Sequence, residues 1–358
     1  MGIIVAIIIF GIIVTVHEFG HFICAKLSGI KVIEFSVGMG PKLLQKKKGE
    51  TAYSLRLLPV GGYCAMEEDI ESDDPRNFRK AKLWKRVIVL AAGAFNNFVL
   101  GFIMIAILIC TLSGVPTNTV SGFVGVRNDD GTATYYAESY NTGLRKQDKI
   151  IRMDETRVYS NLDINFLLAS GKDTFDLVVV RDGEKVELPN VRFHDNYYKE
   201  VEGTDSGGVY DFGLVYNKKN PLTVIKGSGD IFMSMSHIVG LSLKQLVSGE
   251  VSKDDVSGPV GVVSAISETT AQSKGLLDTI SSIAYMTALI TINIGIMNLL
   301  PIPGLDGGRL LFCLIEFVRR KPVKPEHEGY VHLAGMVLLF GIMIFATYND
   351  IVRLVTGG

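Results

Sequence analysis

The chain has 358 residues, of which 47% are hydrophobic, and its 36 Lys and Arg nearly balance its 37 Asp and Glu. This balance excludes the bulk basicity that is typical of nucleic-acid-binding proteins, so we expect no nucleic-acid partner. About 20 apolar residues suffice to cross a bilayer as a helix. Four apolar runs are long enough, at residues 1–25, 87–115, 279–305 and 329–349. We therefore expect a polytopic α-helical membrane protein with four spanning helices, in contact with a lipid bilayer.

The first run contains the sequence His17-Glu18-Phe19-Gly20-His21 inside an otherwise apolar span. Ionisable groups are costly within a membrane and usually mark a function. The run lacks the basic start and the small-residue cleavage site of a signal peptide, so we expect it to be retained. On a helix, residues 17 and 21 are about 40° apart, so both imidazoles project from one face. This spacing predicts a zinc site, with Glu18 beside it as general base.

The segment between the first two runs, residues 26–86, carries 13 Lys and Arg. Its alternating stretch Tyr53–Met66, with Gly61 and Gly62 inside it, predicts strands that are broken by a turn or bulge. Gly38 and Gly40 lie in the apolar stretch before it. We expect a membrane-associated β-hairpin region here.

Lys and Arg also gather in the segment between the last two spans, where residues 307–328 hold five of them. Basic loops face the cytoplasm, so this segment and the first loop are expected inside and both termini outside. The long stretch between spans two and three must then face outward. Its residues 120–200 read as a small α/β domain, with a helix from Ser160 and a hairpin turn at Asp182-Gly183. An amphipathic helix is predicted over residues 229–247.

A catalytic zinc usually takes three protein ligands, so a third is needed besides His17 and His21. Three histidines are possible: His194, His327 and His332. Asp306 is the better candidate, because prolines and glycines between residues 301 and 308 break the third span near it. Broken helices at membrane depth build ion and substrate sites. Asn293 and Asn298 in the same span offer further amide donors and acceptors.

Together, HEFGH and the stretch "NLLPIPGLDGG" (Asn298–Gly308) resemble the site-2 protease family of intramembrane zinc metalloproteases. The likeness is strongest to the bacterial branch related to the regulator of sigma-E protease, and it covers nearly the whole chain. Further matching stretches are Gly38–Gly40, "PVGGY" (Pro59–Tyr63), "AAGAFNNF" (Ala91–Phe98) and "VSGPVGV" (Val256–Val262). In the outer segment, Gly143–Ser160 resembles a PDZ module, with Gln147 and Glu155 where glycines are usual. Ala94 likewise replaces a usual proline in the second span.

This resemblance implies zinc-dependent hydrolysis of a peptide bond within a transmembrane helix. His17, His21 and Asp306 would be the zinc ligands and Glu18 the general base, while Asn293 and Asn298 would hold the substrate backbone. The strand at Gly61-Gly62 and the Gly38–Gly40 loop would pair with the unwound substrate. Implied substrates are membrane-anchored proteins, namely single-span regulators such as trimmed anti-sigma factors, and signal-peptide remnants. The implied location is the bacterial cytoplasmic membrane, with the PDZ-like domain extracytoplasmic.

The expected organisation is span one at 1–25, a cytoplasmic loop with a membrane-associated β region at 26–86, span two at 87–115, the PDZ-like domain at 120–200, a linker with an amphipathic helix at 201–278, span three at 279–305, a cytoplasmic loop at 306–328 and span four at 329–349. Two other functions use the same features: a metal transporter with the polar groups along its pathway, and a PDZ-bearing scaffold with a non-catalytic zinc site. Glu18→Gln would leave metal transport partly intact while it stops proteolysis, and the zinc content of the purified protein would separate a protease from a scaffold.

Overall fold

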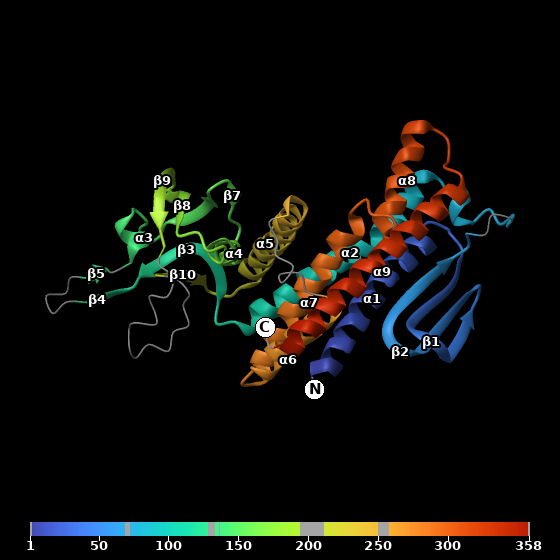
Figure 1. The fold of residues 1–358 in the computed structure, drawn as a ribbon, viewed down its shortest axis with the longest axis horizontal. Coiled ribbons are helices and arrows are strands. Elements are labelled where there is room, and N and C mark those ends of the chain that lie inside the picture. The colour runs from blue at the N-terminus through green and yellow to red at the C-terminus, as the bar shows by residue number, and fades with distance from the viewer. Residues whose placement is uncertain are drawn as a thin grey trace. The chain divides into compact units, whose positions relative to one another are not determined.

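A computed structural model describes residues 2–68, 72–127, 133–135, 137–193, 211–249 and 258–356. The chain divides into two compact units. Met1–Met104 and Ser242–Gly358 form the first unit, and Ile105–Leu241 form the second. Figure 1 shows that the first unit holds long helices and a two-stranded sheet, whereas the second is built around a larger sheet.

Within the described residues, four helices are long and apolar enough to cross a membrane, which confirms the predicted number. They are α1 (Gly2–Leu27), α2 (Leu83–Thr111), α7 (Leu276–Leu299) and α9 (Pro325–Thr356). α2 and α9 begin earlier than the apolar runs that predicted them. Hydropathy marks the part of a helix at membrane depth, whereas charged helix formers such as Lys85 and Arg86 extend the helix beyond it. α2 ends at Thr111 and α7 at Leu299, before the predicted limits of 115 and 305.

Two segments that were expected as a loop and as a linker contain regular structure. Residues 306–328, expected as a loop, include α8 (Asp306–Arg319). In the first loop, a short 3-10 helix, η1 (Phe78–Lys80), precedes α2. Residues 201–278 contain β10 (Phe212–Asn217), α5 (Pro221–Ser248) and α6 (Pro259–Ala271), as well as the start of α7. α5 includes the predicted amphipathic helix 229–247. α8 was missed because its apolar residues are spaced along one helical face and form no continuous apolar run.

The helices of the first unit pack closely around α1. Ala6, Ile9 and Ile13 on α1 form a buried cluster with Ile266 on α6. Farther along, a Cβ atom at Gly20 would lie only 2.3 Å from the carbonyl oxygen of Ala92. Gly20 therefore allows the backbones of α1 and α2 to touch. Small residues at helix contacts are the usual means of close packing within membranes.

The two-stranded sheet is formed by β1 (Val32–Lys48) and β2 (Thr51–Met66). Val37 is paired with both Gly62 and Leu55, so the two long strands bend and lie against each other twice. Positive φ angles at Gly38 (83°), Gly40 (84°) and Gly61 (84°) mark the bends. The predicted interruption of the strands near Gly61 is thus confirmed. Residues 62–66 pair with the first part of β1 and form one edge of the sheet.

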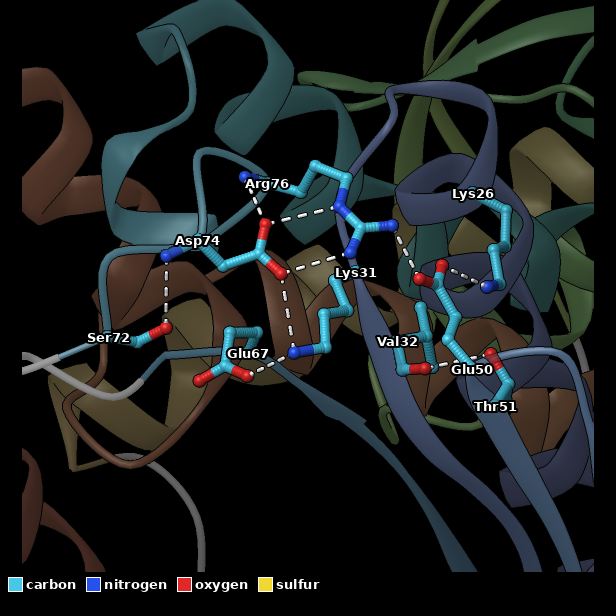
Figure 2. A network of polar contacts seen from close by, with 9 residues as sticks. All are labelled: Lys26, Lys31, Val32, Glu50, Thr51, Glu67, Ser72, Asp74 and Arg76. Atoms are coloured by element: carbon cyan, nitrogen blue, oxygen red, sulfur yellow. Dashed lines mark hydrogen bonds and ion pairs between the residues drawn. The ribbon is translucent and has the colours of Figure 1, made fainter.

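A polar network attaches this sheet to the end of α1 (Figure 2). Lys26, in the last turn of α1, forms an ion pair of 3.0 Å with Glu50, which precedes β2. Lys31 joins Glu67 at 2.9 Å and Asp74 at 3.3 Å. The acidic stretch from Glu67 to Asp74 therefore has paired carboxylates at both ends. Arg76 contributes a further contact, to Asp74 at 3.0 Å.

The second unit contains a sheet with strand order β10-β3-β6-β8-β9, in which β7 pairs with β6. Its other elements are β3 (Val115–Phe123), β6 (Lys149–Met153), β7 (Thr156–Arg157), β8 (Thr174–Arg181), β9 (Glu184–Arg192), α3 (Glu138–Asn141), α4 (Asn161–Leu168) and a separate pair of β4 (Gly125–Arg127) with β5 (Ala133–Tyr135). Ser160 caps α4, as predicted, and Asp182-Gly183 forms the turn between β8 and β9. Because β3 and β10 lie in the same sheet, the folded unit extends beyond the predicted limits of 120 and 200.

Candidate metal centre

Two histidines of α1 and one aspartate of α8 meet inside the first unit. His17 Nε2 lies 3.1 Å from Asp306 Oδ2, and His21 Nε2 lies 3.2 Å from the same oxygen. The two Nε2 atoms are 3.2 Å apart. Both histidines are buried, and Asp306 is half-buried. Among the described residues, this is the group of His, Cys, Asp and Glu side chains that could hold a metal ion.

Asp306 reaches the histidines because α7 stops short of it. Leu300 has an extended ψ of 144°, which is the conformation favoured before a proline such as Pro301. The chain then turns and begins α8 at Asp306. At Gly307, a Cβ atom would lie 1.9 Å from the carbonyl oxygen of Leu300. Only a glycine at this position lets the first turn of α8 approach the end of α7, and this approach places Asp306 at the histidine pair.

Hydrogen bonds on the far side of each ring orient the histidines. His21 Nδ1 lies 2.8 Å from the carbonyl oxygen of Val89, so this nitrogen carries the proton and Nε2 is left as an acceptor. His17 Nδ1 contacts the side-chain amide of Asn97 at 3.2 Å. Gly93 of α2 lies against the Nε2 atoms of both rings, where a Cβ atom would lie 2.5 Å from His21 Nε2 and 2.7 Å from His17 Nε2. The absence of a side chain at Gly93 therefore lets α2 pass directly against the two rings.

A cavity of about 240 Å³ opens beside the three side chains. His17, Glu18 and Asp306 line it together with Asn298 of α7. Glu18 is held at its place by the edge of the sheet, because Cys64 donates its backbone N–H to Glu18 Oε2 at 2.9 Å. The site thus combines two imidazoles, one carboxylate that faces them, a second carboxylate to the side and an amide across a cavity.

Comparison with known proteins shows the family of the chain. The sequence model of peptidase family M50 matches residues 5–342. The chain belongs to peptidase family M50, the site-2 protease family. A "Putative zinc metalloprotease" of Clostridium perfringens is 34% identical, over 98% of this chain and 99% of that protein. One of the same description from Clostridium acetobutylicum is 33% identical, over 98% and 97%. "Probable protease eep" of Enterococcus faecalis is 30% identical, over 98% and 99%.

The protein is therefore a membrane metalloprotease of the site-2 type, and zinc is its cofactor. The geometry fits that ion. Zinc binds histidine nitrogens and carboxylate oxygens at about 2.0–2.2 Å, so neighbouring ligands of a tetrahedral site are about 3.3 Å apart. Sides of 3.1, 3.2 and 3.2 Å in the present triangle are close to this value. His17, His21 and Asp306 would hold the ion, and the cavity opens beside His17 and Asp306.

Buried polar atoms behind the protease's histidines agree with this fit. Asn97 Oδ1 is buried and has no hydrogen-bond partner, while the neighbouring Nδ2 lies against His17 Nδ1. The oxygen and nitrogen of a side-chain amide are assigned from such networks. With the amide turned over, Oδ1 accepts the N–H of His17 Nδ1. That choice gives His17 the same tautomer as His21, with both Nε2 lone pairs directed toward the ion.

The predicted site residues divide into two groups. The structure brings His17, Glu18, His21, Asp306 and Asn298 to one place. Gly62 lies near them, since a Cβ atom there would be 3.8 Å from Glu18 Cγ. The other residues are not at the cavity: Asn293 is exposed on another face of α7, and Gly38, Gly40 and Gly61 lie at the bends of the sheet.

Of the alternative third ligands, His332 has a different role, because its Nδ1 accepts the N–H of Gly304 at 3.0 Å and so holds the segment before Asp306. His327 is exposed at the start of α9, and His194 lies outside the described residues. Asn97 and Gly93 were matched to the family pattern but given no role. The sequence signal that could have found them is their spacing, because Gly93 and Asn97 lie four residues apart in the second span.

Proposed function

We propose that this protease hydrolyses peptide bonds within transmembrane segments of membrane-anchored proteins. The observation that carries the proposal is the position of the His17, His21 and Asp306 triangle. Both histidines lie on α1, which is long and apolar enough to span a membrane, and Asp306 begins α8 shortly after the end of α7, a second helix of this kind. Zinc, when bound, polarises the scissile carbonyl and acidifies a water molecule. A site of this kind serves substrates that are themselves in the membrane.

We assign the general base to Glu18. It lines the cavity beside His17 and Asp306 without belonging to the triangle. One of its carboxylate oxygens is held by the Cys64 N–H, and we assign the proton transfer to the other. Asn298 lines the same cavity and is suited to hold a substrate carbonyl or N–H by its amide. Glu18 therefore handles the proton, and Asn298 orients the peptide.

The edge of the sheet is suited to hold the substrate in an extended form. Phe35 pairs with Cys64, Ser36 with Tyr63 and Val37 with Gly62, which is a regular antiparallel register. The Cys64 N–H points away from β1, to Glu18. Alternate residues of a strand direct their backbone groups to the same side, so the backbone of Gly62 also faces away from β1. A substrate that is unwound from its helix can replace its lost hydrogen bonds along this edge.

The substrates that we propose are single-span proteins, including regulators such as anti-sigma factors already trimmed by another protease, and signal-peptide remnants. The test compares membrane fragments by quantitative proteomics in cells that express the wild type or Glu18→Gln. Single-span fragments should accumulate only with the variant, because their final cleavage is blocked. If the two sets of membrane fragments are identical, the protease acts on other proteins and the proposal fails.

We also propose that the second unit is an extracytoplasmic PDZ-like domain and that the protein lies in the bacterial cytoplasmic membrane. Ion pairs that join the two basic segments support a common side for them. Arg79 pairs with Glu328 at 3.3 Å, and Glu68 pairs with Arg309 at 3.0 Å. By the positive-inside rule this common side is the cytoplasm.

Single cysteines introduced at exposed positions of a cysteine-free variant test this orientation. With an impermeant thiol reagent, Asp182→Cys should be labelled in intact cells, whereas Lys47→Cys should be labelled only after lysis. Both positions are exposed in the structure, so a difference reports the side of the membrane and not burial. Labelling of Lys47→Cys alone in intact cells would reverse the proposed topology.

An outer hydrogen bond to the metal site gives a further prediction. Asn97→Ala should weaken zinc binding by about 10–100-fold, the usual effect of removing a group that orients a metal ligand. Zinc affinity is measured by competition with a chelator, so the result does not depend on activity. Asn96→Ala is the matched control, because the Asn96 amide donates to the carbonyl oxygen of Val16 and does not contact a histidine. Equal zinc affinity in wild type and Asn97→Ala would contradict the role.

A further inference from the structure

A second pocket, of about 280 Å³, lies at the end of the first unit where α2 and α9 begin. Arg79 and Arg86 line it from η1 and α2, Phe312 and Glu316 from α8, and Lys324 and Glu328 from the start of α9. The metal centre is lined by different residues. The volume is near the lower limit of about 300 Å³ for small-molecule pockets. It suits a small polar group.

The two arginines have hydrogen-bond capacity that the protein does not use. Arg86 Nη1 pairs with Glu316 at 2.8 Å, and Arg79 Nη1 pairs with Glu328 at 3.3 Å. The Nε atoms of both arginines are buried and have no hydrogen-bond partner. Arg86 as a whole is only 9% exposed. A buried donor without a partner costs about 1–3 kcal/mol, more when it is charged, so these atoms favour a ligand that accepts hydrogen bonds.

The charges in the pocket favour an anion that carries one negative charge. Three basic side chains and two carboxylates line it, which leaves a net charge of plus one. The first turns of α2 and α9 also lie here, and helix N-termini attract anions. A phosphodiester carries one negative charge, whereas a phosphate monoester carries about 1.5 to 2. The balance of charges therefore matches a phosphodiester best.

The surroundings of the pocket indicate where such a group comes from. Next to Glu316, the side chains of Phe317 and Val318 are 70% and 73% exposed, and Leu314 is 58% exposed. On α9, Tyr330 is 74% exposed. The first three lie on α8 and Tyr330 lies near the start of the spanning helix α9. Exposed apolar side chains beside a spanning helix are suited to acyl chains. The pocket and this apolar border together match the two parts of a phospholipid.

We propose that this pocket, defined by Arg79, Arg86, Glu316, Lys324 and Glu328, binds the phosphodiester headgroup of a membrane phospholipid. Its acyl chains lie against the exposed apolar side of α8. The proposal is independent of the proteolytic function.

The test measures thermal unfolding of the purified full-length protease in neutral detergent. Phosphatidylglycerol, diacylglycerol with the same chains and inorganic phosphate are titrated separately. A ligand that binds the folded state raises the unfolding temperature in proportion to its affinity. We expect a saturable rise with phosphatidylglycerol and a much smaller one with the other two. An equal rise with diacylglycerol would overturn the headgroup contact, and an equal rise with inorganic phosphate would overturn the assignment to a lipid.

Variants locate the binding. Lys324→Gln removes an exposed charge from the pocket and should weaken phosphatidylglycerol binding by about tenfold, the effect of one hydrogen bond to a charged group. Lys321→Gln is the matched control, because Lys321 is exposed at the same end of the unit and does not line the pocket.

The double variant Arg86→Met with Glu316→Leu removes the buried pair without leaving a lone charge. It should lose the rise in unfolding temperature with phosphatidylglycerol. If this double variant does not fold, Lys324→Gln decides. Unchanged affinity in Lys324→Gln, or an equal loss in Lys321→Gln, would overturn the proposal.

Discussion

Glu18→Gln should retain one zinc ion per chain and lose peptide hydrolysis by about 10²–10⁴-fold, the usual contribution of a general base. The two effects separate because Glu18 lies beside the ligand triangle and not in it. Glutamine has nearly the same shape, and its side-chain oxygen can still accept the Cys64 N–H. The cavity should therefore keep its form while it loses the group that takes up the proton.

Zinc content by elemental analysis and single-turnover cleavage of a membrane-embedded peptide measure these two effects. Glu268→Gln is the matched control, since Glu268 is exposed on α6 and does not line the cavity. A Glu18→Gln protease that cleaves at the wild-type rate would remove the residue from the mechanism. Loss of zinc from this variant would instead make Glu18 part of the metal site.

Asp306→Ala should lose zinc as well as activity. This carboxylate is the single anionic member of the triangle, and without it two neutral imidazoles remain to bind a doubly charged ion. The loss of zinc affinity should exceed the roughly 10–100-fold expected when an outer hydrogen bond such as that of Asn97 is removed. His17→Ala should behave in the same way. Activity falls in these variants because the ion is missing, which distinguishes them from Glu18→Gln.

Chelator competition ranks the zinc affinity of these variants against wild type. Asp278→Ala is the control for a carboxylate lost from α7, because Asp278 is exposed in the first turn of that helix. Full zinc occupancy in both Asp306→Ala and His17→Ala would refute the assigned ligands. If the wild-type protein binds zinc normally but cleaves no peptide, the scaffold function is favoured.

The parts of the site that sequence reasoning predicted are those with a local cause. The spacing of His17 and His21 fixes two side chains on one face of any helix, and the structure has their Nε2 atoms 3.2 Å apart. Asp306 was found by the broken helix before it. Its contact with His17 spans 289 positions of the sequence, so the distance itself could not be predicted.

Features that depend on tertiary packing were missed. The role of Asn97 follows from how α2 lies behind α1, and that of His332 from how α9 lies beside the segment before Asp306. Asn293 was grouped with Asn298 because both are amides in one span. Five residues of a helix turn the side chain by about 140°, so the two amides face different sides and only Asn298 lines the cavity.

The absence of a side chain at Gly93 has a stereochemical consequence. Because Gly93 brings α2 against the Nε2 atoms of both histidines, the backbone of α2 closes that side of the histidine pair. The cavity lined by Val14, Ile294 and Asn298 lies on another side. We therefore expect the scissile bond and the water that attacks it to approach from the side of the cavity, because the backbone of α2 occupies the other. We expect the approach to have a single handedness, so that a peptide containing a D-residue at the scissile bond binds without being cut.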